Sequence, residues 1–296
     1  MAARRAITLT EMLATVGGLT CLFAALVPAL IEAKDAANQA ACAANLAQIG
    51  RALALYASEH NGDLPDCGAA STLGGAIPAD GRHVASRTNA PGTCAWPDVR
   101  AVGNQANLWL LVRSEYAQPR VFVCPATADR PSLNSADSLR TMGFLATDPA
   151  TARPVPAEAR FLQKIAAGRC SYSYQNQFAH PGTDPQTARP GASTINQAYH
   201  PMDLAVVADR NPYTRTDLTR QPVVSPDTYP DANSLNHHGA GQNVLYLSGE
   251  VHWQTTPHCG PLRPDGVRDN IYWPDAGRPD DPNNLPRSPA DAFLVP

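Results

Sequence analysis

Four histidines and one cysteine, residue types that supply nitrogen and sulfur ligands to zinc in proteins, lie close together late in this chain of 296 residues. The residues concerned are His237, His238, His252, His258 and Cys259. No two of them have the i, i+4 spacing that places both ligands on one helix face, and the chain contains no C-x-x-C pair. The pattern favours a polar loop beside a β-hairpin, so we expect no metal ligand among these residues.

Serine, histidine and aspartate are also frequent, but no spacing among them selects a catalytic triad. The chain has no G-x-S-x-G elbow, no H-E-x-x-H motif and no phosphate-binding loop. We therefore expect that the protein is not an enzyme. Its formal net charge of −3 gives no electrostatic reason to expect nucleic acid as a partner.

The N-terminal segment of the chain is long enough and apolar enough to cross a membrane as a helix. Residues 1–6 form a short basic leader, and Glu11 is the only charged residue from Ile7 to Ile31. At about 1.5 Å per residue, that helix would span about 37 Å, enough for the bilayer core. A secretory signal peptide would have a shorter apolar stretch. A plain anchor would not be expected to contain a carboxylate, which costs at least about 2.5–3.5 kcal/mol at membrane depth.

The segment Arg4-Arg5-Ala6-Ile7-Thr8-Leu9-Thr10-Glu11-Met12-Leu13 resembles the class III leader of type IV prepilins and type II secretion pseudopilins. The resemblance implies that a prepilin peptidase cuts between Ala6 and Ile7, and that Ile7 is then N-methylated. It also implies that Glu11 is the assembly glutamate, which pairs with the amine of a neighbouring subunit. The alternative for Glu11 is that its carboxylate only reaches the lipid headgroups.

Three residues inside the apolar segment lower its helix stability, namely Gly17, Gly18 and Pro28. Because this region often unwinds in assembled pilins, we expect a bend or a melted stretch between Gly17 and Pro28.

The helical pattern continues beyond the membrane segment without a break. The residues of an apolar seam recur at steps of four, three, four and three: Cys42, Leu46, Ile49, Leu53 and Tyr56. Asn61-Gly62, followed by Pro65, predicts the helix end. Residues 42–50 (CAANLAQIG) also resemble a C-x-x-N-L-x-Q-I-G run that recurs in one large bacterial pilin-like family.

The remainder predicts a β-rich head with long irregular loops. We expect a short helix over 107–116 and strands over 120–125, 171–176 and 204–209, with irregular segments at 66–105 and 126–165. The strands 243–247 and 250–253 would form a hairpin through a two-residue turn, Ser248-Gly249. This hairpin resembles the H-x9-D-G motif of pilin-like proteins, with His238 and Gly249 in place and Ser248 where aspartate is usual.

Disulfides and calcium follow from the expected compartment and from the resemblance. Because the head would fold outside the reducing cytoplasm, we expect the disulfides Cys67–Cys94 and Cys124–Cys170, while Cys21 stays free in the membrane. Some pseudopilins bind calcium in a C-terminal loop, and oxygen ligands suit that ion. Acidic residues are available here, but a solvated tail is the simpler interpretation: Asp265, Asp269, Asp275, Asp280 and Asp281.

The predicted organisation is α+β, a pilin fold in which a long N-terminal helix packs on an antiparallel sheet. It comprises a leader (1–6), a transmembrane assembly helix (7–31), its amphipathic continuation (32–60) and an exported head (61–296). The resemblance implies a pilin or pseudopilin subunit, minor or specialised, of a type IV pilus or type II secretion-type filament. A membrane-anchored binding or adhesion module is the alternative.

The expected partners are prepilin peptidase, other pilin or pseudopilin subunits and inner-membrane lipid. No cofactor is expected apart from the calcium considered above. The predicted location is the inner membrane, crossed once, with the head in the periplasm or on an extracellular filament.

Overall fold

The computed structural model describes most of the long helix and the core of the head. The described residues are 9–65, 105–130, 170–175, 195–214, 224–275, 277–279, 286, 288 and 290–295. The predicted cleavage site at Ala6 and Ile7 lies outside these residues, as do Cys67 and Cys94.

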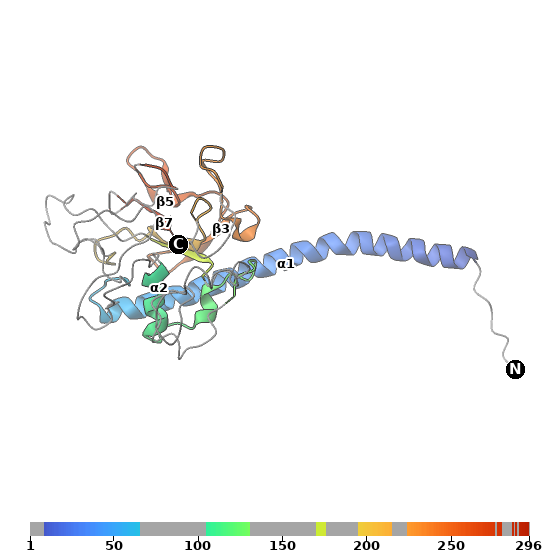
Figure 1. The fold of residues 1–296 in the computed structure, drawn as a ribbon, viewed down its shortest axis with the longest axis horizontal. Coiled ribbons are helices and arrows are strands. Elements are labelled where there is room, and N and C mark those ends of the chain that lie inside the picture. The colour runs from blue at the N-terminus through green and yellow to red at the C-terminus, as the bar shows by residue number, and fades with distance from the viewer. Residues whose placement is uncertain are drawn as a thin grey trace, which may run out of the picture.

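One helix dominates the molecule. Helix α1 (Leu9–Glu59) is 51 residues long and has Pro28 in its interior (Figure 1). Its C-terminal part packs against the head, and its N-terminal part projects away from it. The predicted apolar seam is confirmed, because Cys42, Leu46, Ile49, Leu53 and Tyr56 are the residues that α1 buries, together with small side chains between them.

The end of α1 has the backbone geometry that the Asn61-Gly62 signal predicts. Asn61 and Gly62 have positive φ values of 56° and 87°, and the Gly62 N–H donates to the Ala57 carbonyl at 2.8 Å. This is the left-handed termination that glycine permits at low cost. The side-chain amide of Asn196 then donates to the Asn61 carbonyl and to Asp63, which fixes the path of the chain as it leaves the helix.

The head is built on a five-stranded antiparallel sheet with the order β4-β3-β2-β1-β7. A separate two-stranded ribbon pairs β5 with β6. The bounds are β1 (Tyr172–Gln175), β2 (Ala205–Asp209), β3 (Gln242–Tyr246), β4 (Val251–Gln254), β5 (His258–Leu262), β6 (Arg268–Asn270) and β7 (Leu294–Val295). Because β1, β2 and β3 are buried along their whole length, this sheet forms the centre of the core. The described structure therefore has the α+β layout that the sequence predicts.

Helix α1 crosses this sheet at β3, with α2 (Gln105–Arg113) and the short 3-10 helices η2 (Pro119–Phe122) and η4 (Leu235–His237) around it. Gly50 makes the close approach possible. A Cβ atom at Gly50 would lie 2.9 Å from Leu245 Cδ1, closer than carbon atoms normally pack. The absence of a side chain at this position therefore sets how near α1 lies to the sheet.

The segment 120–125, predicted to be a strand, is instead the 3-10 helix η2 followed by an extended residue. Pro119 occupies its first turn, where a fixed φ and the missing N–H suit a helix start. Val121 and Phe122 bury their side chains beside α1 rather than pairing with a sheet edge. The apolar composition of segment 120–125 is typical of a buried segment, but its burial comes from contacts with helix α1 rather than from pairing in a sheet.

The C-terminal hairpin is confirmed, with its turn one residue longer than predicted. Tyr246 N–H donates to the Glu250 carbonyl, and Gly249 N–H donates to the Tyr246 carbonyl, each at 2.9 Å. The loop is therefore Leu247-Ser248-Gly249, with Gly249 at φ +88°. A three-residue loop that ends in a left-handed glycine is a common hairpin connection.

Candidate functional site

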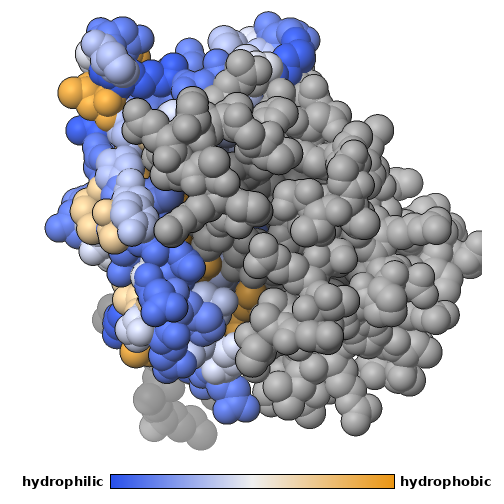
Figure 2. Space-filling view, turned by 90° about the vertical axis from the view of Figure 1, so that its left-hand side faces the viewer, coloured by the Kyte–Doolittle hydropathy of each residue, from blue (hydrophilic) through white to orange (hydrophobic). Residues whose placement is uncertain are grey.

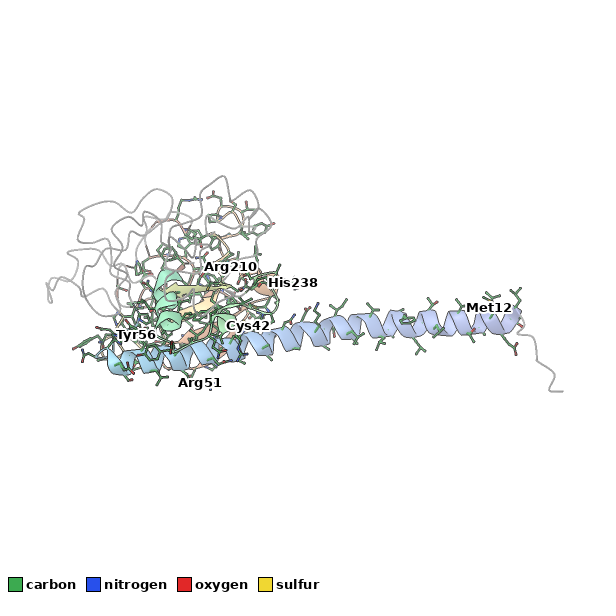
Figure 3. All side chains as sticks on the ribbon, turned by 60° about the horizontal axis from the view of Figure 1, so that its bottom comes forward. Met12, Cys42, Arg51, Tyr56, Arg210 and His238 are labelled. Atoms are coloured by element: carbon green, nitrogen blue, oxygen red, sulfur yellow. The ribbon has the colours of Figure 1, made fainter. Side chains whose placement is uncertain are left out.

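The projecting part of α1 is the largest apolar surface of the described structure. Its large hydrophobic side chains, from Leu9 to Ile31, are each at least half exposed. Figure 3 shows them directed to all sides of the helix, from Met12 near the far end to Cys42 where the helix meets the head. A helix that is apolar all round is stable only where lipid or protein covers it.

The length of this part suits a bilayer. Residues 9–31 would extend about 34 Å at 1.5 Å per residue, and Glu32, Lys34 and Asp35 follow directly. Among the described residues, α1 is the one helix long and apolar enough to cross a membrane. By contrast, the described residues on the end of the head opposite the projecting helix are mainly hydrophilic (Figure 2).

The residues expected to loosen α1 do not interrupt it. Gly17, Gly18 and Pro28 all lie within the continuous helix, so the described structure has no melted stretch there, while a bend in this segment stays a prediction. A proline removes one backbone N–H donor from the helix. The hydroxyls of Thr15 and Thr20 donate to carbonyls one turn earlier, which satisfies these polar groups inside the apolar part of the helix.

Glu11 lies in the first turn of α1, on the exposed surface of the projecting part. A carboxylate near a helix N-terminus interacts favourably with the helix dipole. The structure thus places Glu11 on the exposed apolar surface of α1.

The hairpin residues singled out in the sequence lie at the surface of the head. His238 is exposed, with a left-handed backbone at φ 58°. Ser248 and Gly249 are exposed at the tip of the turn, where the Ser248 hydroxyl accepts a hydrogen bond from the Glu250 N–H. These residues shape the hairpin and do not converge on one site.

An open surface pocket of about 390 Å³ lies beside this hairpin and the β5–β6 ribbon. Its lining is about evenly polar and apolar, and its polar side chains include Ser248, Glu250, His252 and Arg268. Glu250 and His252 pair with each other at 3.2 Å and remain largely exposed.

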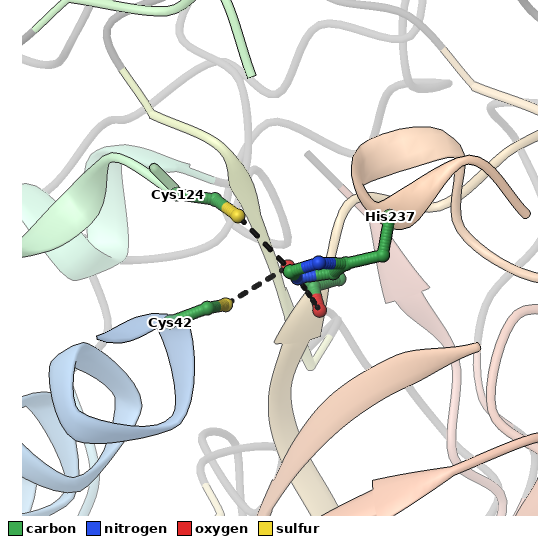
Figure 4. Close-up of side chains that lie close together, drawn as sticks. Cys42, Cys124 and His237 are labelled. Carbon is green, nitrogen blue, oxygen red and sulfur yellow. Dashed lines mark hydrogen bonds and ion pairs between the residues drawn. The ribbon is translucent and has the colours of Figure 1, made fainter. Parts of the chain in front are cut away.

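A buried cluster of polar side chains lies where α1 enters the head. Cys42, Cys124, Asp209 and His237 are all buried and offer one ligand-type atom each, all within 4.8 Å of one another. Figure 4 shows Cys42 and Cys124 pointing toward His237 from two different elements. The cluster could hold a metal ion.

The electrostatics of this cluster centre on Asp209. Burial, with contributions from Cys124 and Asp209, raises the pKa of the Cys42 thiol far above its usual range. Burial lowers the pKa of His237, but hydrogen bonds to Asp209 and Cys42 outweigh it and raise that pKa to about 10.

This geometry corrects one expectation from the sequence. The predicted Cys124–Cys170 disulfide is not formed: both are free cysteines, since Cys124 Sγ lies 3.5 Å from His237 Nε2 and Cys170 Sγ faces the Tyr172 carbonyl. The fold also brings one of the late histidines, His237, beside Cys42, Cys124 and Asp209. Its partners are not neighbours in sequence, so only the folded chain brings them together. Cys21 is free and exposed on α1, as expected.

The acidic tail is arranged around an arginine. Asp269, Asp275 and Asp291 gather within 4.8 Å, and the Arg263 guanidinium bonds both Asp269 and Asp275. Protein cations thus balance part of this charge. Asp265 instead caps a turn through the Val267 N–H, and Asp280 and Asp281 lie outside the described residues.

Comparison with protein-family models, with curated proteins and with solved structures finds no match for this chain. The sequence motifs and the geometry of α1 and the head are therefore what point to a function.

Proposed function

We propose that this protein is a pilin-type structural subunit, anchored in the inner membrane by α1 and assembled through that helix into a type IV pilus or type II secretion-type filament. The observation that supports the proposal most is a single continuous helix with two different surfaces. Its first part exposes apolar side chains on all sides, and its last part buries one face against the head.

This arrangement suits a filament subunit for a physical reason. Apolar helices that leave the membrane together remain buried if they pack against one another along a filament axis, because the hydrophobic surface is then covered by other subunits. The heads would surround that bundle, and their described outer end is mainly hydrophilic.

The rigid link between helix and head supports the same role. Asn45 Nδ2 donates to the Val123 carbonyl at 3.0 Å, and Asn243 Nδ2 donates to the Gln39 carbonyl at 3.2 Å. With the close contact at Gly50, these bonds fix the direction of the projecting helix relative to the sheet. A fixed direction lets identical subunits repeat one geometry along a filament.

The test is incorporation of the full chain into filaments in a host that supplies prepilin peptidase and the assembly machinery. Sheared filaments should contain the mature chain, detected by an antibody against the head. A chain that stays entirely in the membrane fraction, while a known subunit of the same machinery assembles normally, would contradict the proposal.

A binding role for the head is the second candidate, and the open pocket between Glu250, His252 and Arg268 favours it. Its mixed charges suit a polar ligand such as a glycan or a charged peptide. Glycan-array binding that is lost in His252→Ala and retained in His238→Ala would support this role beside the structural one.

A further inference from the structure

The buried cluster at the base of the head is assembled from four separate elements. Cys42 comes from α1, Cys124 from the segment after η2, Asp209 from the end of β2 and His237 from η4. All four side chains are at most 7% exposed. Their convergence therefore depends on the whole fold and joins the helix to three parts of the head (Figure 4).

Three distances between ligand-type atoms of the cluster fall in the range of the edges of a tetrahedral zinc site. Zinc bonds of about 2.0–2.3 Å in tetrahedral geometry separate neighbouring ligand atoms by roughly 3.3–3.7 Å. Cys124 Sγ lies 3.5 Å from His237 Nε2, and Cys42 Sγ lies 3.3 Å from Asp209 Oδ1. His237 Nε2 lies 3.4 Å from Asp209 Oδ2. Two sulfurs, one imidazole nitrogen and one carboxylate are a ligand set that zinc accepts.

The carboxylate is held in place by neighbours that do not belong to the cluster. Asn236 Nδ2 donates to Asp209 Oδ1, and the Asn243 N–H donates to Asp209 Oδ2, both at 2.8 Å. Hydrogen bonds of this kind orient metal-binding carboxylates. No lysine or arginine among the described residues pairs with Asp209, which is fully buried. Arg210, the next residue, bonds Asp129 instead.

A metal ion suits the chemistry of the cluster better than a hydrogen-bonded network or a disulfide does. A network would rely on thiols, which are weak donors and acceptors. A Cys42–Cys124 disulfide would take both thiols out of the cluster. It would not explain why His237 and Asp209 are buried beside these two sulfurs. Both cysteines are free in the structure.

We propose that Cys42, Cys124, His237 and Asp209 bind a structural zinc ion that fastens the head to α1. The ion is coordinated by two thiolates, the carboxylate and the neutral imidazole, and the displaced protons pass to solvent. The positive charge of the metal is what allows buried thiols to ionise. The ion enters as the head folds, since a preformed site does not exist in the unfolded chain. This inference goes beyond the filament role and does not depend on it.

The first measurement is metal content of the full-length chain, purified in detergent with a reductant and without chelator. Inductively coupled plasma mass spectrometry should find zinc equimolar with the chain. Replacement of zinc by Co²⁺ should produce thiolate-to-cobalt charge-transfer absorption and the intense visible bands of a tetrahedral ion. Absence of both bound zinc and the cobalt spectrum would overturn the proposal.

Variants locate the site. Cys42→Ser, Cys124→Ser and His237→Ala should each lose the bound metal. Matched controls change residues of the same type elsewhere: Cys170→Ser and Cys259→Ser are buried cysteines outside the cluster, and His238→Ala is the exposed neighbour of His237. Equal metal loss in the controls, or full retention in the cluster variants, would show that the metal binds elsewhere.

A measurement on the unaltered chain covers the case in which a variant does not fold. Chelation should lower the thermal midpoint of the head and expose α1 near Cys42 to protease, and added zinc should restore both. A chain indifferent to chelator and to zinc would contradict the proposal. Peptide mapping of protein from its membrane that finds Cys42 bonded to Cys124 would overturn it as well.

Discussion

Glu11 lies in the apolar part of α1, and under the proposed function it is an assembly contact. We expect Glu11→Leu to leave the protein inserted and folded while filament incorporation falls strongly. Removing a carboxylate from membrane depth favours insertion by up to about 3 kcal/mol, so poor insertion cannot explain such a loss. Sheared-filament yield, with membrane level measured in parallel, tests this prediction.

The control for Glu11 is Glu32→Gln, which removes a carboxylate from the same helix just beyond the apolar part. Incorporation of this variant should be near that of the wild type. Equal incorporation of Glu11→Leu and Glu32→Gln would mean that Glu11 makes no assembly contact.

Asp269 predicts a pH-dependent contribution to stability. Its burial raises its pKa to about 6, although the Ala292 N–H and Arg263 lower it. Because the carboxyl pKa is raised, the contribution of Asp269 to the stability of the fold is fully present below about pH 4. This contribution is lost as the pH rises through about 6. Arg263→Met removes the cation beside the ionised carboxylate, so its destabilisation should be larger at pH 8 than at pH 5. Thermal midpoints at the two pH values measure the difference.

The control for this pair is Arg278→Met, which removes an arginine from an exposed pair with Asp227. Solvent screens exposed ion pairs, so its effect should be small at both pH values. An Arg263→Met effect that is independent of pH would show that Asp269 does not titrate in this range.

The contact between α1 and β3 depends on the absence of a side chain at Gly50. Gly50→Leu should lower the free energy of unfolding by about 1–3 kcal/mol, the usual cost of overpacking a core, because it would meet Leu245 of β3. Ala44→Leu, at an exposed position of the same helix, should change stability little. Thermal unfolding followed by tryptophan fluorescence compares the two. Equal midpoints would show that the sheet moves to accept the side chain.

Elements with a local pattern were predictable from the sequence. The seam from Cys42 to Tyr56, the Asn61-Gly62 helix end and the hairpin around Gly249 each depend on residues close together in the chain. The secondary structure of segment 120–125 was not predictable, because an apolar run of that length is compatible with a strand or a short helix. This segment packs as a 3-10 helix against α1, which is far away in sequence.

The polar cluster could not be predicted for the same reason. From local patterns, the sequence predicts Cys42 as part of the apolar seam and Cys124 as part of a disulfide. It predicts Asp209 only as the last residue of a strand. The ordering β4-β3-β2-β1-β7 brings the end of β2 beside η4 and α1, and pairing order is a tertiary property. Spacing rules find metal ligands on one helix or one turn, not ligands from four elements.

The molecule as a whole consists of a head at one end of a helix whose other end is apolar (Figure 1). The buried part of α1, from Cys42 to Ala57, belongs to the hydrophobic core of the head, so removing these residues would unfold the head.

The most direct test of α1 as an assembly helix is the intact mass of the protein recovered from the membrane of a host with prepilin peptidase. We predict a chain that begins at Ile7 and has gained one methyl group, so that α1 remains complete. A chain shortened by the whole apolar part, or one that keeps residues 1–6 while another prepilin in the same cells is processed, would contradict this role for α1.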